Sequence, residues 1–173
     1  SEAEVYGAEV ELQWSPNERT YTMLGLGWVD TEYTDFVQAD GTDFSGNKFQ
    51  NAPEFTFNGL VQYRFDGLGN WSVTPQLDWS FAQGYFINLA NDSFVDITPT
   101  ERYRVETEDD WDVNFRLIFE SIDLAFSVTA FIEDIGENQG DITQHYPSFD
   151  SLGTSMTNIS RPETYGLTFA YEF

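Results

Sequence analysis

Apolar and polar side chains alternate with a period of two along most of this chain. In the final stretch, for example, the large side chains of Tyr165, Leu167 and Phe169 are separated by Gly166 and Thr168. Successive side chains of a β-strand point to opposite faces, whereas a helix repeats every 3.6 residues. The sequence therefore predicts an all-β protein with no helix of any length. Its seven alternating segments are 6–14, 24–28, 54–65, 71–81, 111–120, 124–132 and 165–173.

The connections between these segments alternate between short and long. Short connections, rich in the residues that tight turns require, lie at 15–19, 66–70 and 121–123. Long polar connections lie at 37–53, 86–102 and 134–162. Outer-membrane β-barrels have short periplasmic turns and longer external loops. The pattern predicts an antiparallel transmembrane β-barrel in a bacterial outer membrane, whose last strand ends at the periplasmic rim.

Composition excludes several classes of protein. The formal charge of −23 would repel nucleic acid, so we expect no nucleic-acid partner. The aromatic content of 17% argues against a disordered acidic chain. Cysteine is absent, so the chain has neither disulfides nor thiolate metal ligands. No apolar run reaches the length of a transmembrane helix.

A soluble β-sandwich also shows period-two alternation, so the barrel needs further support. All five tryptophans lie on the apolar parity, toward the ends of the predicted strands: Trp14, Trp28, Trp71, Trp79 and Trp111. Trp71 and Trp79 are separated by roughly 26 Å along a strand, or about 20 Å of height in a tilted one. This height matches the apolar band of such barrels, so we expect these tryptophans in the aromatic girdles at the membrane interfaces. The opposite parity is too polar for a dry core and suits a water-filled lumen.

Four segments resemble the TonB-dependent outer-membrane receptors. Residues 1–12 (SEAEVYGAEVEL) are similar to the approach to a late barrel strand of that family, and residues 26–36 (LGWVDTEYTDF) to its next strand. Residues 51–58 (NAPEFTFN) resemble the segment that opens a strand after an external loop. Residues 161–173 (RPETYGLTFAYEF) resemble the C-terminal strand.

The resemblance implies about seven C-terminal strands of a 22-stranded barrel, with residues 1–173 forming the C-terminal part of the barrel domain. The plug domain, the earlier strands and the segment that contacts TonB would lie outside this chain. We therefore expect a fragment, a proteolytic half or one subunit of a split receptor. Its partners would be outer-membrane lipid and lipopolysaccharide, the rest of the barrel, the plug and, through the plug, TonB.

The resemblance also implies a function: import of a scarce nutrient such as siderophore-bound iron, a vitamin or an oligosaccharide. The alternative is a small autonomous outer-membrane barrel that serves adhesion or structure, although such barrels have an even number of strands. An outer-membrane enzyme is a third reading. The sequence offers no Ser-His-Asp or Cys-His set, so we expect no enzyme and no cofactor.

Acidic residues gather in the predicted external loops and at the adjoining strand rims. Carboxylate oxygens suit divalent cations, which could also bridge the chain to lipopolysaccharide phosphates. The competing interpretation, which we weight more heavily, is a solvated acidic surface. The candidates are Glu101, Glu108, Asp109 and Asp110, followed by Glu133, Asp134 and Asp141.

The chain ends on an alternating aromatic strand. In outer-membrane barrels a terminal aromatic residue on such a strand resembles the signal that is read by the barrel-assembly machinery. Tyr171 and Phe173 are the candidates here. Phe173 is equally expected as the last lipid-facing residue of the strand.

Overall fold

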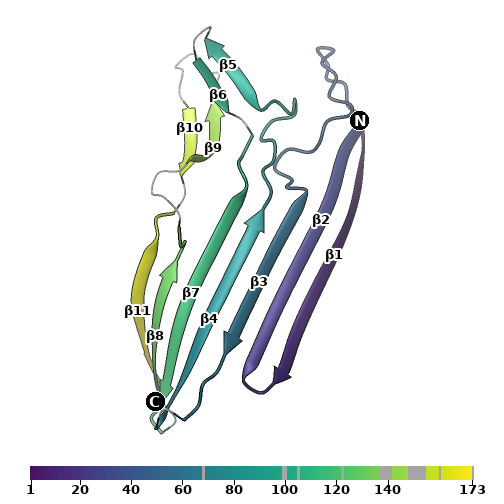
Figure 1. The fold of residues 1–173 in the computed structure, drawn as a ribbon. Coiled ribbons are helices and arrows are strands. Elements are labelled where there is room, and N and C mark those ends of the chain that lie inside the picture. The colour runs from purple at the N-terminus through teal and green to yellow at the C-terminus, as the bar shows by residue number, and fades with distance from the viewer. Residues whose placement is uncertain are drawn as a thin grey trace.

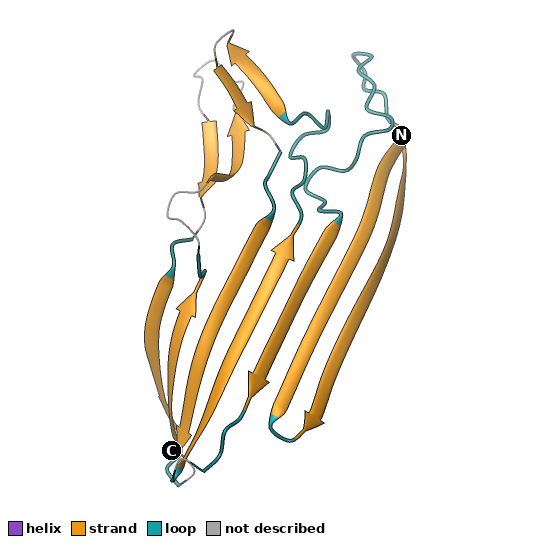
Figure 2. Ribbon diagram, viewed as in Figure 1, coloured by secondary structure: helices purple, strands orange, loops and turns teal. Residues whose placement is uncertain are grey.

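The fold comes from a computed structural model, which describes residues 1–67, 69–98, 101–104, 106–121, 123–136, 142–147, 155–159 and 161–172. All regular elements of this described part are strands, as Figure 2 shows. None of its segments forms a helix long and apolar enough to cross a membrane.

The main feature is one antiparallel sheet in the order β1-β2-β3-β4-β7-β8-β11 (Figure 1). Its seven strands confirm the number predicted from the alternation. The sheet is a single open layer, and β1 and β11 are its two edges. The strands are β1 (Glu2–Asn17), β2 (Thr20–Asp35), β3 (Phe55–Tyr63), β4 (Trp71–Ala82), β7 (Asp110–Ser121), β8 (Phe126–Glu133) and β11 (Thr164–Tyr171).

Two stretches predicted as loops contain additional strands, which corrects that prediction. β5 (Phe94–Thr98) pairs with β6 (Glu101–Arg104), and β9 (Ile142–Pro147) pairs with β10 (Ser155–Ile159). Both hairpins lie beyond the long-connection end of the main sheet (Figure 1). Each of these strands is only four to six residues long. Stretches this short give too few alternations to stand out from a polar loop.

The first hairpin is longer than the alternation predicted. β1 and β2 each contain 16 residues, and their pairing continues from Trp28 to Asp35, past the apolar stretch. Beyond Trp28 the apolar parity becomes acidic, with Asp30 and Glu32 on β2. Backbone pairing needs no apolar face, so the ladder extends where the hydrophobic pattern has ended.

The short connections are closed by local side-chain and backbone chemistry. Between β1 and β2, the Asn17 carboxamide oxygen accepts hydrogen bonds from the backbone N–H groups of Arg19 at 2.9 Å and Thr20 at 3.0 Å. Between β3 and β4, Gly67 and Gly69 have φ values of 97° and 69°, which glycine adopts without steric cost. A tight turn therefore joins β1 to β2 within the predicted range 15–19, although β1 continues to Asn17 and leaves only Glu18 and Arg19 between the strands.

The register joins the apolar parities of neighbouring strands into one face. Leu26 pairs with Val10 on one side and with Phe57 on the other, and the same alignment continues through the other strands. Among the described residues, Ile87 is the only buried large hydrophobic side chain. The sheet therefore presents its apolar face outward instead of burying it. Exposed members of this face include Val10, Leu12, Trp14, Leu26, Trp28, Leu77, Trp111, Ile132, Tyr165, Leu167 and Phe169.

Candidate functional site

Arg116 is the centre of a charged network on the polar face of the sheet. It lies on β7 and donates hydrogen bonds to Asp78 on β4 and, at 2.9 Å, to Glu133 on β8. The side chains of Arg116 and Asp78 are only 30% and 23% exposed. One guanidinium thus neutralises carboxylates from both neighbouring strands in a partly desolvated position, where charge pairing is stronger than at an open surface.

Asn114 extends this network toward the long-connection end. Its carboxamide nitrogen donates to Asp78 at 3.0 Å and to Asp112 at 2.6 Å, and its oxygen accepts from the backbone N–H of Asp134 at 3.0 Å. Asp134 has a φ of 56°, in the left-handed region. Desolvation, reinforced by the nearby carboxylates of Asp112 and Glu133, raises the pKa of Asp134 above its ordinary value.

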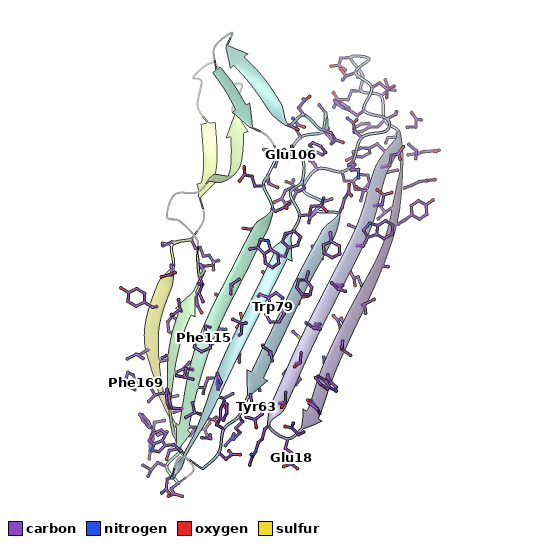
Figure 3. All side chains as sticks on the ribbon, viewed as in Figure 1. Glu18, Tyr63, Trp79, Glu106, Phe115 and Phe169 are labelled. Carbon is purple, nitrogen blue, oxygen red and sulfur yellow. The ribbon has the colours of Figure 1, made fainter. Side chains whose placement is uncertain are left out.

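A second polar cluster lies at the short-turn end of the same face. Arg64 donates to Asp66 at 3.0 Å and to Glu120 at 3.1 Å, so it reaches across β4 to β7. Ser72 of β4 pairs with Glu120 in the register and is fully buried, and its hydroxyl lies 3.4 Å from the Glu120 carboxylate. The cluster borders a cavity of about 410 Å³, which Ser15, Asn17, Glu18, Arg19, Thr20, Tyr21, Gln62, Arg64, Thr74, Ile118 and Glu120 line. Figure 3 labels Glu18 at this end of the molecule.

At the opposite end, two long connections are fastened together by side-chain-to-backbone hydrogen bonds. Asn91 accepts from the backbone N–H of Lys48 and donates to the Lys48 carbonyl at 3.0 Å, and Asn47 donates to the Leu89 carbonyl at 2.7 Å. The Lys48 ammonium also pairs with Asp30, inside β2, and with Glu54, directly before β3. The loop at 36–53 is therefore tied both to the sheet and to the segment after β4.

Aromatic packing against β2 and local hydrogen bonds organise this loop. Tyr33 packs against Phe36 and Phe49, with ring centroids 5.0 Å and 4.6 Å away. The backbone N–H of Thr42 donates to Asp40 at 3.0 Å, and this bond lowers the pKa of the Asp40 carboxyl. The hydroxyl of Ser45 lowers the pKa of Asp43 in the same way.

The predicted acidic candidates are not gathered into one cluster. In the part of the chain that the structure describes, no group of three or more His, Cys, Asp and Glu side chains is placed to hold a metal ion. Asp109 instead accepts a backbone hydrogen bond from Gly84 at 2.8 Å, and Asp110 begins β7 as an exposed residue. Glu133 belongs to the Arg116 network and Asp134 adjoins it, whereas exposed Glu108 lies in the segment before β7. Asp141 lies outside the described residues, and Glu101 is described only as a backbone position of β6.

The tryptophans occupy the apolar face, as the alternation predicted. Trp71 begins β4 and lies edge-on to Phe126, with ring centroids 6.2 Å apart; Trp14 likewise lies near the short-turn end of β1. Trp111 lies at the other end and packs 4.7 Å from Phe81. Trp79, labelled in Figure 3, lies inside β4. Trp28 lies in the middle of β2, because that strand continues to Asp35, so its expected place at a strand end was wrong. Their membrane role stays a prediction.

The last strand ends at the short-turn end of the sheet, which agrees with the predicted direction. Tyr171 is the last residue of β11 and pairs with Phe126, and the backbone N–H of Glu172 donates to the Ala125 carbonyl at 2.8 Å. Phe173 lies outside the described residues. The assembly role of Tyr171 and Phe173 stays a prediction.

Sequence reasoning missed the two arginines on which the polar face depends. Arg116 and Arg64 each lie among polar residues in the strand pattern. Three of their four carboxylate partners are 17 to 56 positions away, and only Asp66 is close in sequence to Arg64. An arginine on the polar parity of a strand interior is the one available signal, because such a cation requires a nearby carboxylate when it is partly desolvated.

Solved structures that share this fold include two siderophore receptors, while no protein-family model matches the chain. The ferric yersiniabactin uptake receptor FyuA from Yersinia pestis matches with a TM-score of 0.75 at 13% identity, over 99% of this chain and 24% of that receptor. BauA, the ferric preacinetobactin receptor from Acinetobacter baumannii, matches with a TM-score of 0.68 at 18% identity, over 99% of this chain and 22% of that receptor. The chain thus spans about a quarter of the length of these receptors. Its antiparallel seven-stranded sheet has the fold of part of a siderophore-receptor barrel and is not closed on itself.

Proposed function

We propose that this chain forms part of a TonB-dependent outer-membrane receptor that imports a scarce nutrient. The observation that carries the proposal is a single-layer sheet with an exposed apolar face, in the fold of two siderophore receptors. An apolar patch of this extent in water marks an interaction surface, and lipid is the partner that fits a continuous band across seven strands. The charged networks of Arg116 and Arg64 would then line the lumen.

The open edges fit the same proposal. In hydrocarbon an unpaired strand edge leaves backbone N–H and C=O groups without partners, at several kcal/mol each. β1 and β11 therefore require further strands, supplied by the same protein or by a partner chain. A plug domain would fill the lumen and connect the receptor to TonB. The long connections would face outward, near lipopolysaccharide, and Tyr171 would lie at the periplasmic side.

The proposed role is binding and transport without catalysis. The cargo would be siderophore-bound iron, a vitamin or an oligosaccharide, and it would contact the lumen face and the external loops. The structure gives no specific support to a small autonomous barrel for adhesion. A closed barrel of this chain alone would have to pair β1 with β11, and these are the two outer strands of an open sheet.

The test uses the complete natural protein in its bacterial host. Membranes are separated on a density gradient, and the receptor is expected in the outer-membrane fraction as a heat-modifiable species larger than this chain. Growth on scarce iron, cobalamin or oligosaccharide is then compared between the parent, a strain without the receptor and a strain without TonB. Loss of growth on the same nutrient in both mutants supports the proposal. A native species with the mass of this chain alone that resists SDS would overturn it.

A further inference from the structure

The polar face of the main sheet would form one wall of the lumen. The sign of the charge on this wall determines which solutes it attracts. The register places the carboxylates of two neighbouring β1 positions, Glu9 and Glu11, on this face. Further carboxylates of the same face lie on β4, β7 and β8: Asp78, Asp110, Asp112, Glu120 and Glu133. Among the described side chains, its cations include Arg19 in the turn after β1 and Arg64 next to β3, which both line the cavity at the short-turn end, and Arg116 on β7.

All three of these cations are paired. Arg116 lies between Asp78 and Glu133, and Arg64 lies between Asp66 and Glu120. Arg19 pairs with the same Asp66 at 3.2 Å. A carboxylate partner reduces the attraction of each arginine for an anionic solute.

Toward β2 and β3, Glu9 and Glu11 have no cationic neighbour on this face. Both are exposed, and their partners on β2 are Gly27 and Gly25. Glycine has no side chain with which to cover or neutralise a carboxylate. The next side chains across the sheet are the neutral Thr56 and Asn58 of β3.

We infer that this wall favours cationic solutes over anionic ones, so that the cargo class that fits it is a positively charged chelate or other cationic molecule. The inference rests on the proposed function, because the polar face must line the lumen. A confined passage bounded by low-dielectric walls focuses the field of its charges and concentrates solutes of the opposite sign. The effect belongs to the whole wall and does not require a single binding site.

The test measures the local potential with a thiol in the purified complete receptor. This chain contains no cysteine, so Gln13→Cys places a reporter on the same face, one polar-face position along β1 from Glu11. The thiol is reacted with a cationic reagent, trimethylammonium-ethyl methanethiosulfonate, and with an anionic one, sulfonato-ethyl methanethiosulfonate. Each rate is divided by the rate of the same reagent with 2-mercaptoethanol, which corrects for the reagent's intrinsic reactivity. We expect a cation-to-anion rate ratio on the order of tenfold in 10 mM salt, which falls toward one in 1 M salt as screening shortens to about 3 Å.

Two charge variants assign the effect to this wall. Glu9→Gln with Glu11→Gln should bring the ratio at Gln13→Cys most of the way to one. The matched control, Glu4→Gln with Glu32→Gln, removes the same charge from a facing pair on the other parity and should leave the ratio nearly unchanged. A ratio at or below one in the parent, or one that is insensitive to Glu9 and Glu11, would overturn the inference.

The outcome is separable from that of the proposed function. The thiol rates need neither TonB nor energised uptake, so a strain that takes up nothing still yields the ratio. The cargo itself is tested by mass spectrometry of small molecules that co-purify with the receptor from nutrient-limited cells. A co-purified molecule with net positive charge supports the inference, and one with net negative charge contradicts it.

Discussion

The indole ring of Trp79 on β4 lies over Gly59 of β3, so closely that a Cβ at position 59 would be 2.3 Å from the ring atom Cζ2. The two residues are direct cross-strand partners on the apolar face, and Phe57 lies beside the ring at 6.0 Å. An aromatic ring that covers a glycine in a neighbouring strand shields the backbone and fixes register. Position 59 therefore has to stay free of a side chain if Trp79 is to keep this orientation.

We expect Gly59→Ala to destabilise the folded receptor by about 1–3 kcal/mol, the usual range for overpacking. Val61→Ala on the same strand and face is the control for a generic change in apolar area. Heat-modifiability and denaturant unfolding in detergent measure the difference. Combining Gly59→Ala with Trp79→Leu should recover much of the loss, because the indole ring that would clash with the new Cβ is then absent. Equal losses in the single and double variants would contradict the packing account.

A second prediction concerns the Arg116 network. Arg116→Met would leave Asp78 and Glu133 without their shared counter-charge in a partly buried position, and we expect a loss of about 1–3 kcal/mol. Arg19→Met is the matched control, because that guanidinium is 55% exposed and its ion pair with Asp66 should contribute less than about 1 kcal/mol. Denaturant unfolding of both variants tests the ranking, and a larger loss for Arg19→Met would reverse it.

Features of this molecule that depend on local alternation were predictable from the sequence, whereas features that depend on the register between strands were not. Alternation as in Tyr165–Tyr171 identified all seven sheet strands, because parity is a local property of a strand. The ion pairs of Arg116 were not predictable, because they depend on the register between β4, β7 and β8. The hairpins at β5–β6 and β9–β10 were missed because short strands carry weak patterns. Charge density alone also suggested metal ligands, but the geometry gives Asp109 a backbone partner instead.

The two hydrogen bonds between Asn91 and Lys48 join the loop at 36–53 to the segment after β4. We therefore predict that these two segments open together. Asn91→Gly keeps a residue suited to the φ of 53° at this position while it removes both side-chain hydrogen bonds to Lys48, together with the longer one to Asn88. We expect faster amide exchange and faster proteolysis at 36–53 and at 86–91, with the main sheet unchanged. Asp92→Ala, at the neighbouring exposed position, serves as the control. Protection that is lost in only one of the two segments would show that they are independent.

The last prediction follows from the raised pKa of Asp134. A carboxyl whose folded pKa lies above its unfolded value of 3.8 favours the protonated form in the folded state, so its ionisation weakens folding at higher pH. Asp134→Asn removes this charge and keeps a residue that tolerates the left-handed backbone. We therefore expect the variant to be more stable than the parent at neutral pH. The gain should shrink as the pH falls through the folded pKa and disappear below about 3.8. Thermal unfolding between pH 3 and pH 8 measures it; a gain that persists undiminished in acid would contradict the assigned cause.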